Sequence, residues 1–173
     1  MDIKQRAKRI KLLLMDCDGV MTDGRLYFGA SGEELKVFNV RDGQGIVSWH
    51  KAGFESGIIS GRDAEAIIGK RAEDLGMRYV KVRSRDKIED LAAILAESKV
   101  SPDEVCFIGD DIGDVGIMRR VGLAVAVADA VEEVKAAAHF MTLADGGHGA
   151  IRELTDLLLE NAGDQVNNPR AAS

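Results

Sequence analysis

Two aspartates, Asp16 and Asp18, directly follow an apolar run near the N-terminus, in the segment KLLLMDCDGV. Side chains two residues apart on an extended segment point to the same side, so these carboxylates can converge. A second acidic segment, GDDIGD (109–114), contains Asp110 and ends the apolar run EVCFIG. If both runs are strands of one parallel sheet, the three acids meet at the edge where the strands end. Gathered carboxylates raise each other's pKa unless a cation lies among them, and oxygen ligands favour Mg²⁺.

Ser60 and Lys87 follow two further apolar runs, GFESGII (53–59) and MRYVKV (77–82). Each residue alone also fits an ordinary role, because aspartates and serines commonly form turns and helix caps and lysines are usually exposed. Together, however, the chain order is Asp-x-Asp, Ser, Lys and Gly-Asp-Asp. A metal ion, an ammonium group and small hydrogen-bond donors around a carboxylate form an anion site suited to phosphoryl transfer.

The elements that must position these residues alternate along the chain. Apolar runs of strand length occupy residues 11–16, 53–60, 77–82, 104–109, 122–127 and, as a short last strand, 139–142. Apolar residues recur at helical spacing over residues 63–75, 86–97 and 149–160. Such alternation indicates right-handed βαβ units and a parallel sheet. We therefore predict an α/β fold, a three-layer Rossmann-like parallel sheet.

The segment RLYFGASGEELKVFN (25–39) interrupts this alternation. Two alternating apolar arms flank ASGE, which predicts a β-hairpin inserted between the first strand and the first helix. The insertion is too short for a cap domain, and it leaves the sheet at the edge where open α/β sheets bind ligands. We expect a flap over the site or a contact between subunits, with a plain surface hairpin as the alternative.

Composition limits the possible classes of protein. The chain has 173 residues, a formal net charge of −6 and 46% hydrophobic residues. These values predict a single domain over residues 1–162 and exclude a general nucleic-acid binder. No stretch predicts a membrane span, and Cys17 and Cys106 lie in apolar runs, as buried reduced thiols of a cytoplasmic protein would. The polar residues 163–173 predict a disordered tail.

The motifs DCDGV, IISGR, Lys87 and GDDIGD resemble, in order, the four motifs of the haloacid dehalogenase superfamily of phosphatases. The resemblance spans nearly the whole predicted domain and implies a Mg²⁺-dependent phosphoric monoester hydrolase. It implies that Asp16 attacks phosphorus and forms an aspartyl-phosphate, while Asp18 acts as general acid and then as general base. The implied ligands of Mg²⁺ are the Asp16 carboxylate, the Asp18 carbonyl oxygen and the Asp110 carboxylate.

The same resemblance implies roles for other residues of these motifs. Ser60 and Lys87 would bind phosphoryl oxygens, and Asp111 and Asp114 would orient the water ligands of the metal. Asp23, which lies past the turn at the base of the hairpin, is expected to have a structural role.

The segments MTDGRLYFGASGEELKVFNVRDGQGI and GGHGAIRE resemble the capless subclass of the superfamily. This implies hydrolysis of 3-deoxy-D-manno-octulosonate 8-phosphate, in the synthesis of the inner-core sugar of lipopolysaccharide. It also implies a homotetramer in which the hairpin and a neighbouring subunit close the site. An arginine suits the sugar carboxylate because its fork binds both oxygens. The implied substrate contacts are Asn39, Val40, Arg41, Asp42, Gly43, Arg62 and Lys70.

Three alternatives remain open from the sequence. The motifs do not separate this substrate from 9-phosphates of nonulosonic acids of the sialic-acid type. A receiver-like phosphoacceptor signalling domain has a similar fold, but its acceptor aspartate follows the third strand, and MRYVKV ends without one. A scaffold with a decayed site would lack some of the reactive residue types, all of which are present. Among the histidines, only His148 is expected to be able to reach a site.

Overall fold

A computed structural model describes residues 2–163 of the chain. Its centre is a six-stranded sheet with the order β5-β4-β1-β6-β7-β8, and every neighbouring pair of strands is parallel. The predicted α/β fold is therefore confirmed. In chain order, the strands of this sheet are β1 (Leu12–Met15), β4 (Glu55–Ile59), β5 (Tyr79–Lys81), β6 (Val105–Gly109), β7 (Leu123–Ala126) and β8 (Phe140–Met141).

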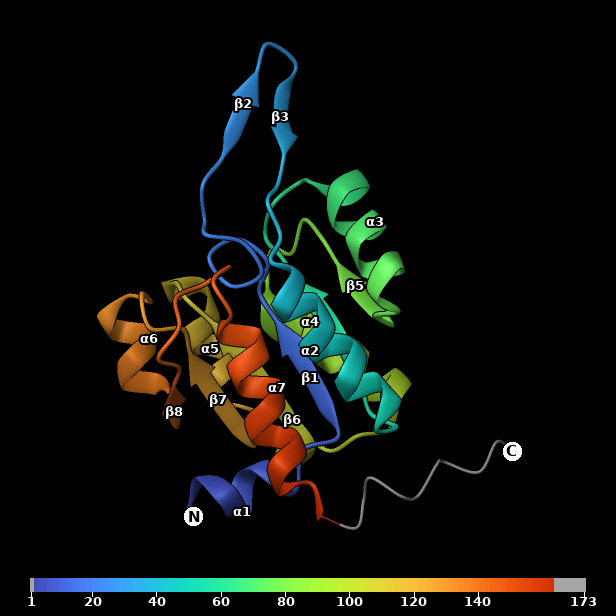
Figure 1. Cartoon of the computed structure of the whole chain (residues 1–173), viewed down its shortest axis with the longest axis vertical. Coiled ribbons are helices and arrows are strands. Elements are labelled where there is room, and N and C mark those ends of the chain that lie inside the picture. The colour runs from blue at the N-terminus through green and yellow to red at the C-terminus, as the bar shows by residue number, and fades with distance from the viewer. Residues whose placement is uncertain (1, 164–173) are drawn as a thin grey trace.

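Helices cover both faces of the sheet. Helices α2 and α7 pack against each other in front of β1 in Figure 1, and α4 and α5 pack together behind the sheet. The α-helices are α1 (Ile3–Ala7), α2 (Val40–Lys51), α3 (Glu65–Leu75), α4 (Lys87–Ser98), α5 (Val115–Met118), α6 (Glu132–Ala137) and α7 (Ala150–Asn161). Two short 3₁₀ helices, η1 (Pro102–Glu104) and η2 (Ile112–Asp114), precede and follow β6. Among residues 2–163, no helix is both long and apolar enough to cross a membrane.

The apolar runs of the sequence form the inner strands because both of their faces are covered. All four residues of β1 and all five of β6 are buried, as expected for the middle of a parallel sheet between two helical layers. Each of the six strands lies within its predicted range. Helix α3 begins at Glu65, two residues after the predicted start, and its N-cap residue makes no side-chain capping bond.

The predicted hairpin is formed by β2 (Tyr27–Gly29) and β3 (Gly32–Leu35), which pair in antiparallel fashion. In Figure 1 it projects from the end of the molecule at which β1 ends. The hairpin is the only insertion after β1, and residues 2–163 contain no cap domain. Its exposed apolar side chains, with those of the segments on either side, are Leu26, Tyr27, Phe28, Leu35 and Val37. Apart from residue 163, the predicted tail lies outside the described residues.

Candidate active site

Three aspartate side chains meet where β1 and β6 end. The two strands pair in parallel, with Met15 opposite Ile108, and Asp16 and Asp110 directly follow them. One carboxylate oxygen from each of Asp16, Asp110 and Asp114 lies within 4.8 Å of the others. The structure thus brings together two acids of the predicted metal site, and the third carboxylate of this acidic group is that of Asp114.

Close approaches of the backbone make this arrangement possible. Gly19 has a φ of +91°, which favours glycine, and a Cβ at this position would overlap the Asp110 carboxylate. Gly146 lies so near that a Cβ there would overlap the carbonyl oxygen of Gly19. The amide of Gly147 donates a hydrogen bond to the Val20 carbonyl oxygen (2.9 Å). The glycine-rich segment before α7 therefore braces the loop that follows β1.

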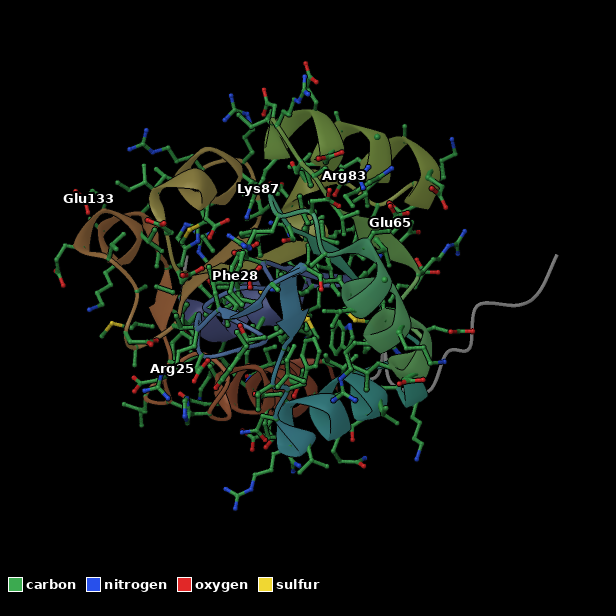
Figure 2. All side chains as sticks on the ribbon, turned by 90° about the horizontal axis from the view of Figure 1, so that it is seen from above. Arg25, Phe28, Glu65, Arg83, Lys87 and Glu133 are labelled. Atoms are coloured by element: carbon green, nitrogen blue, oxygen red, sulfur yellow. The ribbon has the colours of Figure 1, made fainter. Side chains whose placement is uncertain are left out.

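Lys87 connects two members of the acidic group. It is the first residue of α4, and Asp86 caps this helix by accepting a hydrogen bond from a backbone amide (2.8 Å). The Lys87 ammonium donates to Asp16 Oδ1 (2.8 Å) and to Asp114 Oδ1 (2.6 Å). All three side chains are largely buried. Figure 2 looks down on the molecule from the side of the hairpin and labels Lys87 and the hairpin residue Phe28.

Burial and mutual repulsion shift the pKa values of these groups. Burial raises the pKa of Asp16 to about 6, although Lys87 acts in the opposite direction. Burial, together with the charges of Asp16 and Asp114, raises the pKa of Asp110 to about 8. Burial lowers the pKa of Lys87, but the two carboxylates outweigh it and raise that pKa above its ordinary value. The single positive charge of Lys87 therefore does not neutralise the negative charge of the three carboxylates.

These residues fit a divalent cation. Asp110 Oδ1 is buried and accepts no hydrogen bond from the described residues, which is unusual for a buried carboxylate. The donors are all oxygens, which is the ligand type that Mg²⁺ prefers. A cation at this position would satisfy the orphaned oxygen and stabilise the charged forms of Asp16 and Asp110.

Ser60 lies at the same edge of the sheet, because β4 is the neighbour of β1. The residue is 1% exposed, and its hydroxyl accepts a hydrogen bond from the Arg62 amide (3.3 Å). Its carbonyl oxygen accepts from the Ser84 amide (3.0 Å), which ties the Ser60 turn to the loop that leads into Lys87. The hydroxyl of Ser84 is buried and has no hydrogen-bond partner among the described residues.

Asp18 contacts the base of the hairpin. Its Oδ1 forms an ion pair with the ammonium of Lys36, a residue that directly follows β3 and whose side chain is 1% exposed. Asp18 Oδ2 is buried and accepts no hydrogen bond from residues 2–163. Lys36 was not predicted as a site residue. A single lysine inside the otherwise apolar arm LKVF is the available signal, because a buried lysine needs an anionic partner.

Two residues of the predicted substrate segment tie α2 to the start of α7. The Asn39 side chain caps α2, and its amide nitrogen donates to the carbonyl oxygen of Gly147 (3.1 Å). The buried carboxylate of Asp42 accepts from the amides of Gly149 (3.2 Å) and Arg152 (2.8 Å). Both side chains are therefore engaged in holding the helices that surround the site.

The remaining predicted substrate contacts differ in their exposure. Val40 and Arg41, at the start of α2, are exposed and accessible to a ligand. Gly43 is buried against α3, where a Cβ would lie 2.5 Å from Arg71 Nη2. Arg62 follows the Ser60 turn, and its half-buried side chain lies in the loop before α3.

Arg71, rather than Lys70, faces inward from α3. The Lys70 side chain is 67% exposed and pairs with two acids of its own helix. The Arg71 guanidinium lies over the Phe38 ring (5.4 Å), and its Nε is buried without a hydrogen-bond partner among the described residues. Residue 71 is three positions after the buried Ile68 and four before the buried Leu75. Helical spacing therefore predicts that Arg71 shares their face.

Three further residues of the sequence motifs have local partners. Asp111 caps η2, and Asp23 Oδ1 accepts from the Arg25 amide (3.1 Å) at the base of the hairpin. His148 is exposed, and its Nδ1 lies 2.8 Å from the carbonyl oxygen of Gly146 in the same turn. These contacts give Asp23 the structural position that was expected, and they keep His148 within its own loop.

Comparisons with known proteins agree on one family. The model of the haloacid dehalogenase-like hydrolases matches residues 80–154. The 3-deoxy-D-manno-octulosonate 8-phosphate phosphatase of Yersinia pestis is 45% identical over 158 residues, which cover 91% of this chain and 84% of that protein. The crystal structure of the Yersinia pestis enzyme covers 96% of this chain and 89% of its own, with a TM-score of 0.91 and 43% identity.

A second solved structure carries ligands. It is the 3-deoxy-D-manno-octulosonate 8-phosphate phosphatase from Moraxella catarrhalis in complex with a magnesium ion, a phosphate ion and a KDO molecule. It is 32% identical to this chain, with a TM-score of 0.90. The similarity covers 94% of this chain and 93% of that one.

Proposed function

The chain belongs to the haloacid dehalogenase-like hydrolases, and we propose that it hydrolyses 3-deoxy-D-manno-octulosonate 8-phosphate to the free sugar acid and phosphate. The observation that carries the proposal is the acidic group at the ends of β1 and β6, with Lys87 against it. The relatives that carry this activity in their names span most of the chain. The reaction belongs to the synthesis of the inner-core sugar of lipopolysaccharide, and residues 1–162 perform it as one domain.

Mg²⁺ would be held by the carboxylates of Asp16 and Asp110 and by the carbonyl oxygen of Asp18. When bound, Mg²⁺ supplies positive charge that lets an anionic nucleophile approach an anionic phosphate. The Asp114 carboxylate accepts a hydrogen bond from the Asp110 amide (3.0 Å) and so holds the Asp110 backbone in place. Together with Asp111, Asp114 orients the water ligands of the metal.

The residues of the chain perform two successive displacements. A carboxylate oxygen of Asp16 attacks phosphorus, the bond to the sugar oxygen breaks, and that oxygen keeps the electron pair and takes a proton from Asp18. A water molecule then attacks the aspartyl-phosphate and gives a proton to Asp18, and the bond to Asp16 breaks to restore its carboxylate. Lys87 and Ser60 bind phosphoryl oxygens and stabilise the charge that builds up on them.

The substrate's sugar acid lies against the start of α2, at Asn39, Val40, Arg41, Asp42 and Gly43, and near Arg62. For its carboxylate we assign Arg71 in place of Lys70, because the Arg71 guanidinium lies beside the start of α2 and its Nε has no hydrogen-bond partner among the described residues.

Replacing Arg71 with glutamine is expected to raise KM for the octulosonate 8-phosphate about 10- to 100-fold, which corresponds to the loss of a charge-assisted bidentate contact. The kcat of this variant changes little, and its KM for p-nitrophenyl phosphate, which has no carboxylate, stays the same. Lys70→Gln is the matched variant at the neighbouring, exposed position of α3. Steady-state kinetics on both substrates test the assignment, and a larger KM effect of Lys70→Gln would return it to Lys70.

The active form is a homotetramer in the cytoplasm. Exposed apolar side chains on the hairpin, such as Phe28 (65% exposed) and Leu35 (52%), support a subunit contact there, because such a concentration is costly on a free surface. A neighbouring subunit then closes the site from the hairpin side. The buried thiols of Cys17 and Cys106, which form no disulfide within the described residues, are compatible with a reducing compartment. Light scattering measures the assembly, and cell fractionation measures the location.

Release of inorganic phosphate tests the function. The purified chain with Mg²⁺ is expected to turn over the octulosonate 8-phosphate at least about tenfold more efficiently, in kcat/KM, than nonulosonate 9-phosphates, a difference of about 1.4 kcal/mol. EDTA abolishes release and added Mg²⁺ restores it. A preference for nonulosonates would change the substrate, and full activity in EDTA would remove the metal from the mechanism.

A further inference from the structure

Lys36 is a buried cation that enters the site from the hairpin. It directly follows β3, and its side chain is 1% exposed, although it belongs to the segment that projects farthest from the sheet in Figure 1. A lysine at this level of burial is uncommon unless it is paired with an acid. The acid here is Asp18, which stands two residues after Asp16 and belongs to the reactive loop rather than to the hairpin.

The ion pair makes the two oxygens of Asp18 different. Oδ1 is held by the Lys36 ammonium, whereas Oδ2 is buried and accepts no hydrogen bond from the described residues. A carboxylate held at one oxygen loses most of its freedom to rotate, so the position of the other oxygen is fixed as well. A buried oxygen without a partner is costly, and it persists where a ligand or substrate group completes it.

We infer that Lys36 is a positioning residue for Asp18, holding Oδ1 so that Oδ2 faces the sugar oxygen in the first displacement and the water in the second. The inference rests on the proposed function, in which Asp18 transfers the proton. It also assigns a role to the hairpin beyond covering the site: an ordered hairpin is needed to place the proton donor. Lys36 itself makes and breaks no bond in the reaction.

The test uses leaving groups that differ in their need for a proton. A sugar alkoxide is a poor leaving group and needs the acid, whereas p-nitrophenolate leaves without one. Lys36→Met keeps the length and apolar stem of the side chain but removes the charge. In rapid-quench experiments with full-length protein and Mg²⁺, this variant is expected to form the aspartyl-phosphate from the octulosonate 8-phosphate about 10²-fold more slowly. Its formation from p-nitrophenyl phosphate is expected to slow by less than about threefold, because this leaving group needs no proton.

Two further variants complete the design. Lys36→Arg retains a cation that can pair with Asp18, and it is expected to recover at least about tenfold of the loss on the sugar phosphate. Lys135→Met removes a lysine that forms a surface ion pair with Glu132 in α6, and it leaves both rates unchanged. A retained rate with p-nitrophenyl phosphate also shows that the active site of each variant is folded.

Equal losses on the two substrates would overturn the inference, because they would mean that Lys36 acts on the phosphoryl group and not through Asp18. An unchanged rate on the sugar phosphate would overturn it as well. Turnover by the wild-type chain distinguishes these results from a failure of the proposed function. If the wild type does not turn over the octulosonate 8-phosphate, the substrate assignment fails, and the comparison is made with the alkyl phosphate that it hydrolyses best.

Discussion

Asp16→Asn is expected to lower the rate of phosphate release at least about 10⁴-fold, the range measured when a covalent nucleophile is removed. The neutral amide does not attack phosphorus, and the proposed Mg²⁺ site loses one of its two carboxylates. The neighbouring Asp114 carboxylate is already held by hydrogen bonds from the Lys87 ammonium and the Asp110 amide. The measurement is phosphate release, together with acid quenching to detect the aspartyl-phosphate.

The same substitution is not expected to unfold the protein. Burial raises the pKa of Asp16 to about 6, which shows that the charged carboxylate is unfavourable in the metal-free site. Asparagine has the same shape without the charge, and Lys87 keeps its ion pair with Asp114 (2.6 Å). The melting temperature without metal is therefore expected to stay the same or rise. Asp103→Asn, which removes an exposed ion pair with Arg9, serves as the matched control and keeps full activity.

Measurable turnover by Asp16→Asn, at more than about 1% of the wild-type rate, contradicts the assignment of the nucleophile. A large fall in melting temperature would instead mean that Asp16 holds the fold through Lys87. Because both quantities are measured on the same preparation, the catalytic and the structural explanations are separated.

The fold could be predicted because its signals are local. Each inner strand is an unbroken apolar run, and parallel strands must end at the same edge of the sheet. That rule alone brings Asp16 and Asp110 together, although about ninety residues separate them. The hairpin was predictable for the same reason, since its two arms alternate around a turn-forming segment.

Contacts between distant segments could not be predicted from local patterns. Whether Asn39 and Asp42 face a ligand or the start of α7 depends on how α2 packs, and no local pattern encodes it. The ion pair of Lys36 with Asp18 depends on how the hairpin leaves the sheet. The inward position of Arg71 could have been predicted, because the helical spacing of α3 already places this residue on the buried face.

Lys87→Met is the second substitution with a large expected effect, because Lys87 acts on both charge and geometry. Its ammonium contacts Asp16 and Asp114, and in the proposed reaction it also binds phosphoryl oxygens. The loss of a cation from an anion-stabilising site typically lowers the rate by about 10²- to 10³-fold. We expect kcat to fall about 10³-fold, with the aspartyl-phosphate forming more slowly from both sugar and aryl phosphates. This differs from Lys36→Met, which affects only the substrate that needs a proton.

The stability of Lys87→Met is expected to test the role of this cation independently of the kinetics. Breaking a buried ion pair by removing one partner costs about 3 kcal/mol or more, which corresponds to a fall of roughly 6–12 °C in melting temperature for a chain of this length. Lys135→Met, which breaks only a surface pair in α6, is expected to shift the melting temperature by less than about 2 °C. Thermal unfolding without metal measures both variants.

The pH dependence of this destabilisation has a definite sign. The pKa of Asp16 is raised in the folded protein, so the folded state binds more protons than the unfolded state above the ordinary pKa of an aspartate. Stability therefore falls as the pH rises toward the folded pKa of about 6. Lys87 lowers the pKa of Asp16, and its removal extends this loss to higher pH. The melting temperature of metal-free Lys87→Met should consequently fall more steeply than that of the wild type between about pH 6 and pH 8.

Mg²⁺ distinguishes the two roles of Lys87 from each other. A bound cation replaces the missing charge among the carboxylates, so saturating Mg²⁺ is expected to recover much of the lost stability. It does not replace the ammonium that faces the phosphoryl group, so kcat stays low. A variant that regained both with Mg²⁺ would show that Lys87 only neutralises the acidic group. If Mg²⁺ restores the stability of the variant but not its kcat, Lys87 binds the transferred phosphoryl group. That role appears only in the reaction and not in the resting protein.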